Sequence, residues 1–192
     1  MSRKRARQFE FIVIAGELKG RRVTAPDLGV TRPPLSRLRK SIFDFLTPHL
    51  AGARYLDLFS GTGSYLFEAV SRGAACAVGV EREPALVEAV NRQADEFHVA
   101  DRLRCLQRDV QSALPELADQ GQKFDIIMIA PPQYQGLIDP TLAAIRTCGL
   151  AGSQGLIVCQ HDTSETRELR FEDYPVAQQR KYGNTTFTIL SA

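Results

Sequence analysis

The sequence predicts an α/β fold in which a mostly parallel, seven-stranded sheet carries helices on both faces. From residue 54 onward, short apolar segments of strand length alternate with amphipathic segments of helix length. Near the end, two strand-like segments flank a Tyr-Gly-Asn turn. The first pattern favours β-α repeats and a parallel sheet, and the second adds a C-terminal antiparallel hairpin.

The alternating part of the chain divides into five repeats. The expected strands are residues 55–59, 77–80, 103–106, 124–129 and 155–159. The expected helices are residues 64–71, 84–97, 112–118 and 141–148, and the closing hairpin pairs residues 177–181 with 185–190. Residues 124–129 are apolar through to their end, as in a central buried strand.

The first 48 residues follow a different pattern. Residues 9–14 and 21–24 are strand-like and flank turn residues, so they predict a hairpin that must pack on a larger body. Ser36 can cap a helix that we expect to end before Pro48. We therefore expect a small N-terminal extension over residues 1–48 and a main domain over residues 49–192.

Length and composition place the chain among ordinary globular proteins. Its 192 residues are 44% hydrophobic and 24% charged, and no apolar run approaches the ~18 residues of a membrane span. The four cysteines form no C-x-x-C motif and have no neighbouring histidine cluster. We expect reduced thiols, no metal site, no membrane contact and a cytoplasmic, monomeric protein.

Positive charge is concentrated at the N-terminus. Residues 1–40 hold eleven Lys and Arg residues against three Asp and Glu residues, whereas the rest of the chain is net negative. Such a block predicts contact with a polyanion, and a solvated surface is the alternative. The candidate RNA-binding residues are Arg3, Lys4, Arg5, Arg7, Lys19, Arg21, Arg22, Arg32 and Arg37.

A glycine-containing loop follows the strand expected at 55–59. The segment Asp-Leu-Phe-Ser-Gly-Thr-Gly occupies residues 57–63, at the carboxyl end where open α/β sheets bind ligands. A dinucleotide fingerprint would place a third glycine at Leu66. An acidic residue ahead of the glycines suits a cationic sulfonium cofactor with an amino-acid tail, S-adenosylmethionine, better than a pyrophosphate.

Two further carboxylates follow the next two expected strands. Glu81 is placed to accept both ribose hydroxyls, and Asp109 to accept the adenine amino group with Val110 beside the ring. Each acidic residue alone is more often a solvated loop residue, but three at successive strand ends form a specific set. The candidate cofactor-binding residues are Asp57, Phe59, Ser60, Gly61, Gly63, Glu81, Arg82, Asp109 and Val110.

The segment Ala130-Pro131-Pro132-Gln133-Tyr134 follows the strand expected at 124–129. Two prolines fix φ and remove two donors, which leaves carbonyl groups free to point into a site. Tyr134 can stack on an unpaired base. Pro131, Pro132, Gln133 and Tyr134 are therefore the candidate catalytic residues, although a rigid loop that only ends a strand has the same pattern.

Several of these motifs resemble one known family, the bacterial 16S rRNA guanine-N2 methyltransferases (the RsmD family). The resemblance is carried by the glycine segment with Glu68 and by four further stretches over residues 9–190: Ile14-Ala15-Gly16 with Lys19-Gly20-Arg21, Thr31-Arg32-Pro33, Arg37 with Arg39 and Phe43, and Tyr182-Gly183-Asn184-Thr185. It implies a Rossmann-like class I methyltransferase fold, with which the closing hairpin agrees. It also implies methyl transfer from S-adenosylmethionine to guanine N2 in small-subunit RNA, within an assembled or partly assembled particle.

The chain departs from the family pattern in the catalytic loop. Ala130 stands where the family has Asp or Asn, Gln133 stands at the aromatic position, and Tyr134 comes one residue late. Leu66 replaces a common glycine, and Lys40 a frequent glutamate. Three alternatives stay open: a cofactor- and RNA-binding homologue with impaired catalysis, a methyltransferase for another nucleobase or for protein glutamine, and a nicotinamide-dependent oxidoreductase.

Overall fold

A seven-stranded sheet forms the centre of the computed structural model, which describes residues 8–29, 36–171 and 174–192. The strand order is β5-β4-β3-β6-β7-β9-β8. Strands β3 to β7 are parallel, and only β9 runs against its two neighbours. The predicted fold class, mostly parallel with a C-terminal antiparallel hairpin, is confirmed.

The strands of this sheet have the following bounds: β3 Arg54–Leu58, β4 Cys76–Glu81, β5 Leu103–Gln107, β6 Phe124–Ile129, β7 Ala151–Asp162, β8 Val176–Tyr182 and β9 Thr185–Ser191. The helices are α1 Ser36–Leu50, α2 Ser64–Ser71, α3 Pro84–Glu96, α4 Val110–Asp119 and α5 Ile138–Cys148, with a 3₁₀ helix η1 at Thr163–Arg167. The buried apolar residues form two clusters, one on each face of the sheet. Helices α1, α2 and α3 pack in one cluster and α4 and α5 in the other.

Several expected boundaries were wrong: the first strand ends at Ile12 and not at residue 14, α5 begins at Ile138 and not at residue 141, and β7 covers Ala151–Asp162 and not only residues 155–159. Two other differences have a clear physical cause. Helix α1 does not stop before Pro48 but continues to Leu50. Pro48 lies in the last turn, where it removes a single backbone hydrogen bond, and burial of Leu46 and Leu50 holds that turn in place. Strand β3 ends at Leu58, because Phe59 adopts a left-handed conformation with φ of 67°. The expected division of the chain at residue 48 stays a prediction, and that boundary lies inside α1.

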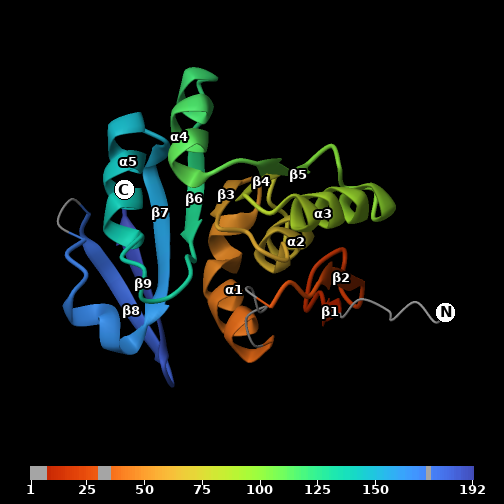
Figure 1. Cartoon of the computed structure of the whole chain (residues 1–192), viewed down its shortest axis with the longest axis horizontal. Helices are drawn as coiled ribbons and strands as arrows, with labels where there is room; N and C mark the ends of the chain where they lie inside the picture. The colour runs from red at the N-terminus through yellow and green to blue at the C-terminus, as the bar shows by residue number, and fades with distance from the viewer. Residues whose placement is uncertain (1–7, 30–35, 172–173) are drawn as a thin grey trace.

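The N-terminal hairpin pairs β1 Gln8–Ile12 with β2 Arg22–Pro26. Figure 1 shows it at the opposite end of the molecule from the β8–β9 hairpin. It docks on α2 and α3: Leu18 N donates to Ser71 Oγ at 2.9 Å, and Thr24 N donates to Gln93 Oε1 at 2.6 Å. Its apolar residues belong to the same buried cluster as α2. The prediction that this hairpin packs on a larger body is confirmed.

Helix α2 is buried along its whole length, between the sheet and the hairpin. The hairpin can approach the end of α2 closely because residue 16 is a glycine, with φ of 85°. A Cβ atom on Gly16 would lie 1.6 Å from the carbonyl oxygen of Ser71, so no other residue fits there without moving the hairpin.

A buried ion pair fastens α1 and the hairpin to α2. Glu68 is fully buried, and its carboxylate accepts from Arg39 Nε and Arg72 Nε, both at 3.2 Å, and from Ile14 N at 2.7 Å. Arg39 also donates to the carbonyl of Ile12 at 2.7 Å. One carboxylate on α2 therefore binds both the N-terminal hairpin and α1.

Candidate functional site

The loop between β3 and α2 has an alternating backbone conformation. Phe59, Gly61 and Gly63 have φ values of 67°, 52° and 74°. Ser60 N donates to the carbonyl of Val80 at 3.0 Å, which ties the loop to β4. A Cβ atom on Gly63 would lie 2.7 Å from Val90 Cγ2, so glycine is required for both conformation and space. A non-glycine residue held left-handed in this way often marks a functional loop.

Asp57 is buried inside β3, with 1% of its surface exposed. Neither carboxylate oxygen has a hydrogen-bond partner among the described residues. Burial raises the pKa of this carboxyl well above its usual range, and the negative charge of Glu81 raises it further. A carboxyl group left without a donor in the core is costly, and therefore indicates a site for a donor that comes from outside the chain.

Glu81 ends β4 and faces the same loop. Its carboxylate accepts from Gly61 N at 2.9 Å, Arg82 N at 2.8 Å and Glu83 N at 3.0 Å. These bonds fix the carboxylate beside the glycine loop, and lone pairs remain for a ligand hydroxyl. The side chain of Arg82 is exposed and approaches Glu83 at 3.9 Å.

Asp109 follows β5 and caps α4, where its side chain accepts from Gln111 N at 2.9 Å. Val110 is buried in the cluster below α4. Because β5, β4 and β3 are adjacent and parallel, the structure places Asp57, Glu81 and Asp109 toward the same edge of the sheet.

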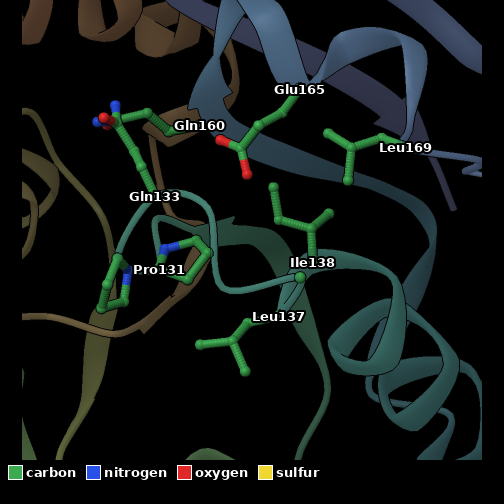
Figure 2. Close-up of a pocket in the computed structure, with 9 residues that line it drawn as sticks. Pro131, Gln133, Leu137, Ile138, Gln160, Glu165 and Leu169 are labelled. Atoms are coloured by element: carbon green, nitrogen blue, oxygen red, sulfur yellow. The ribbon is translucent and has the colours of Figure 1, made fainter.

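The Pro-Pro loop leaves β6 beside the glycine loop, with Ala130 N 3.4 Å from the carbonyl oxygen of Leu58. It borders a hollow that Figure 2 shows with its lining residues. The lining residues are Pro131, Pro132, Gln133, Gly136, Leu137, Ile138, Gln160, Glu165 and Leu169. Tyr134 is 67% exposed with φ of 61°, and its backbone N donates to Glu165 at 2.9 Å.

Gln160 on β7 and Glu165 on η1 are site residues that were not predicted from the sequence. Gln160 accepts a hydrogen bond from the hydroxyl of Tyr65 at 2.5 Å. The available signal was a polar residue at the end of the apolar strand 155–159, one strand away from the Pro-Pro loop.

The candidate RNA-binding residues fall into two groups. Lys19, Arg21, Arg22 and Arg37 are exposed on the hairpin and α1. Arg22 pairs with Glu10 at 2.9 Å, and Arg21 lies over the ring of Phe97. Arg3, Lys4, Arg5, Arg7 and Arg32 lie outside the described residues. Arg39, which counts toward the positive block in the sequence, is buried against Glu68 and presents no charge to a ligand.

Within residues 8–29, 36–171 and 174–192, no helix has the length and apolar character needed to cross a membrane. In the same part of the chain, no three His, Cys, Asp or Glu side chains gather as metal ligands would.

A family model described as conserved hypothetical protein 95 matches residues 11–191. The Escherichia coli K12 ribosomal RNA small subunit methyltransferase D is 29% identical over 151 residues, which cover 78% of this chain and 74% of that protein. The solved yhhF protein of Escherichia coli superposes with a TM-score of 0.84 at 24% identity, over 95% of this chain and 98% of that one.

A Thermus thermophilus enzyme, the 16S rRNA N2 G1207 methyltransferase RsmC solved with AdoMet and guanosine, shares the fold with a TM-score of 0.69. It is 22% identical, and the match covers 96% of this chain and 50% of that one. The sheet order and these neighbours identify the fold as that of class I methyltransferases. The chain therefore belongs to the family described as conserved hypothetical protein 95, the RsmD family.

Proposed function

We propose that this chain transfers a methyl group from S-adenosylmethionine to the exocyclic N2 of a guanine in small-subunit ribosomal RNA. One observation carries the proposal: the buried, unpartnered carboxyl of Asp57 lies at the sheet edge that also holds Glu81, Asp109 and the Pro-Pro loop. The name of the Escherichia coli relative, a small-subunit ribosomal RNA methyltransferase, supports the substrate class.

The residues present fit this cofactor. The Asp57 oxygens lack a donor, which the ammonium group of an amino-acid tail would provide. Glu81 would accept the ribose hydroxyls, and Asp109 the adenine amino group beside Val110. Phe59, Ser60, Gly61, Gly63 and Arg82 would complete the binding loop. The bound sulfonium supplies an electrophilic methyl group.

On the acceptor side, the chain has to orient a weak nucleophile. The N2 lone pair of guanine is delocalised into the ring, so acceptors for its N–H bonds, such as the Pro131 carbonyl, would orient it and stabilise the developing positive charge. N2 would take the methyl group that the cofactor supplies and would release one proton to water. Pro132 would keep the loop rigid, Gln133 would offer an amide oxygen, and Tyr134 would stack on the base.

The remaining surface would hold the RNA backbone. Lys19, Arg21, Arg22 and Arg37 would contact phosphates and fix position without reading sequence, together with the basic residues outside the described part of the chain. We propose that the enzyme acts as a cytoplasmic monomer on an assembled or partly assembled small-subunit particle.

Isothermal calorimetry with S-adenosylmethionine and with NAD tests the cofactor assignment. We expect the wild type to bind S-adenosylmethionine and not NAD. Glu81→Ala should weaken that binding by about 1.5–3 kcal/mol, because hydrogen bonds to a charged group are lost. Glu88→Ala, an exposed change on α3, serves as the control. Tight NAD binding without S-adenosylmethionine binding would contradict the assignment.

The RNA surface is tested by a charge change on the hairpin. Lys19→Ala with Arg22→Ala should leave S-adenosylmethionine affinity unchanged and weaken binding to small-subunit particles. The loss should shrink as salt rises, because phosphate contacts act through counterion release. Filter binding at several salt concentrations measures the affinity of each variant for the particles. Equal affinity for particles at low salt would mean that these two side chains face only solvent.

A second candidate function is favoured by Ala130. Because alanine offers no acceptor side chain at this position, the same site also fits a homologue that binds cofactor and RNA but transfers no methyl group. Methyl incorporation by the wild-type protein separates the two.

A further inference from the structure

Gln160 lies beside the position where this chain lacks a side-chain acceptor. Ile129, the last residue of β6, is in register with Cys159 on β7, so Ala130, which follows β6 directly, comes beside Gln160 of β7. Ala130 packs against the buried cluster that contains Met128 and Val158, and strand alternation places Gln160 on the same face. The two residues are therefore lateral neighbours at the carboxyl edge of the sheet.

The Gln160 side chain is held in place. Tyr65, on the buried helix α2, donates its hydroxyl hydrogen to Gln160 Oε1 at 2.5 Å. Burial raises the pKa of Tyr65, so this hydroxyl stays protonated and keeps donating. A carboxamide oxygen has two lone pairs, so one remains, and both Nε2 hydrogens are left for another partner.

The rest of this side chain borders the hollow beside the Pro-Pro loop. Gln160 lines it together with Pro131 and Gln133, and Figure 2 shows the Gln133 and Gln160 side chains pointing toward one another. Gln133 itself is exposed, and among the described residues its side chain makes no hydrogen bond. Of the two amides, Gln160 is the one whose orientation the protein fixes before a base arrives.

We propose that the Gln160 carboxamide contacts the target guanine and supplies the acceptor that Ala130 lacks. This inference rests on the proposed function. The free lone pair of Oε1 accepts an N2–H of guanine, and Nε2 donates to the adjacent ring atom N3. Tyr65 is a positioning residue that acts through Gln160. A planar amide paired with neighbouring acceptor and donor atoms both orients N2 and rejects bases that lack the amino group.

The test measures methyl incorporation into unmodified small-subunit particles, with kcat and KM, S-adenosylmethionine affinity and melting temperature for every variant. Gln160→Ala should lower kcat about 10- to 100-fold, as expected for loss of preorganised contacts to the reacting group. S-adenosylmethionine affinity should stay within about threefold of the wild type. Tyr65→Phe should give a smaller fall in kcat, because Gln160 remains but is no longer oriented.

Ala130→Asn separates a contact with the base from a structural role. In the Gln160→Ala background it should restore kcat by about tenfold, whereas in the wild type it should change kcat by less than about threefold, which is the coupling expected of two residues with one task. A side chain that only filled space would show no such rescue. Gln178→Ala, an exposed glutamine on β8 of the same sheet, is the matched control and should retain wild-type kcat.

Three outcomes overturn the inference. An active wild type with an equally active Gln160→Ala variant refutes the role of Gln160 and leaves the proposed function standing. If kcat falls in Gln133→Ala and not in Gln160→Ala, the acceptor is Gln133 of the Pro-Pro loop. If Gln160→Ala melts more than about 5 °C lower, Gln160→Met, which keeps the volume, is judged by the same criteria. A wild type that incorporates no methyl group refutes both the proposed function and this inference.

Discussion

Asp57→Asn is expected to cost most of the affinity for S-adenosylmethionine while making the free protein more stable. The substitution keeps the shape of the side chain and removes its negative charge. Losing one partner of a buried, hydrogen-bonded charge pair costs roughly 2–5 kcal/mol, about 30-fold to several thousand-fold in affinity. Calorimetry measures the affinity, and Asp119→Asn, an exposed carboxylate at the end of α4, is the control.

The stability gain follows from the position of Asp57 in the free protein. Its carboxyl is buried without a donor, so at neutral pH the free protein must either bury an unpaired negative charge or hold a proton that the unfolded chain has lost. The neutral amide of asparagine is also unpaired there, but it avoids this cost of the ionisable group. Thermal unfolding should therefore show a higher melting temperature for Asp57→Asn than for the wild type at pH 7. A lower melting temperature together with unchanged affinity would mean that Asp57 supports the fold and has no part in the site.

The same carboxyl makes stability depend on pH in a defined direction. Because burial raises the pKa of Asp57 in the folded protein, the folded state holds this proton at pH values where the unfolded state has lost it. Stability from this group is therefore fully present below the unfolded pKa of about 3.9 and falls as pH rises toward the folded pKa. The gain in stability from Asp57→Asn should therefore increase as pH rises from the unfolded pKa to the folded pKa, and it should be smallest at acid pH.

Glu68→Ala is expected to be strongly destabilising. It would leave Arg39 and Arg72 without their shared carboxylate and Ile14 N without an acceptor. Removing one partner of a buried pair costs roughly 3–5 kcal/mol. For a chain of this size that is a fall in melting temperature of about 6–20 °C.

An exposed pair provides the control for this prediction. Glu96 lies 3.6 Å from Arg92 on the surface of α3, and both side chains are more than half exposed. Glu96→Ala should change stability by less than about 1 kcal/mol, because surface pairs are screened by water. Similar small losses for Glu68→Ala and Glu96→Ala, measured by chemical unfolding, would contradict the view that one carboxylate fastens the hairpin and α1 to α2.

Much of the fold could be predicted because its signals are local. Strand β6 and helix α2 have the predicted bounds, since an apolar run and an amphipathic segment with clear ends leave little choice. The end of α1 could not be predicted in this way. Proline statistics favour an earlier end, and the burial of Leu50 that overrides them is a tertiary effect.

The candidate site also contains residues with a local sequence signal and residues that only the tertiary structure reveals. Asp57, Glu81 and Asp109 could be found in the sequence because each lies within two residues of the carboxyl end of its own strand, and parallel strands bring such ends to one edge. Gln160 could not be found in this way, because its place in the site depends on the register of β7 against β6 and on a hydrogen bond from a hydroxyl on α2. The pairing of Arg39 with Glu68 could not be read from the sequence for the same reason, so one of the eleven basic residues counted in the N-terminal block is a core residue.

The most direct test of the proposed function is nucleoside mass spectrometry of small-subunit ribosomal RNA from a strain that lacks this gene. We expect one N2-methylguanosine to be absent from that RNA and to return when the purified protein and S-adenosylmethionine are added to the unmodified particles. Unchanged N2-methylguanosine in the deletion strain, with no methyl group incorporated into the particles in vitro, would contradict the assignment.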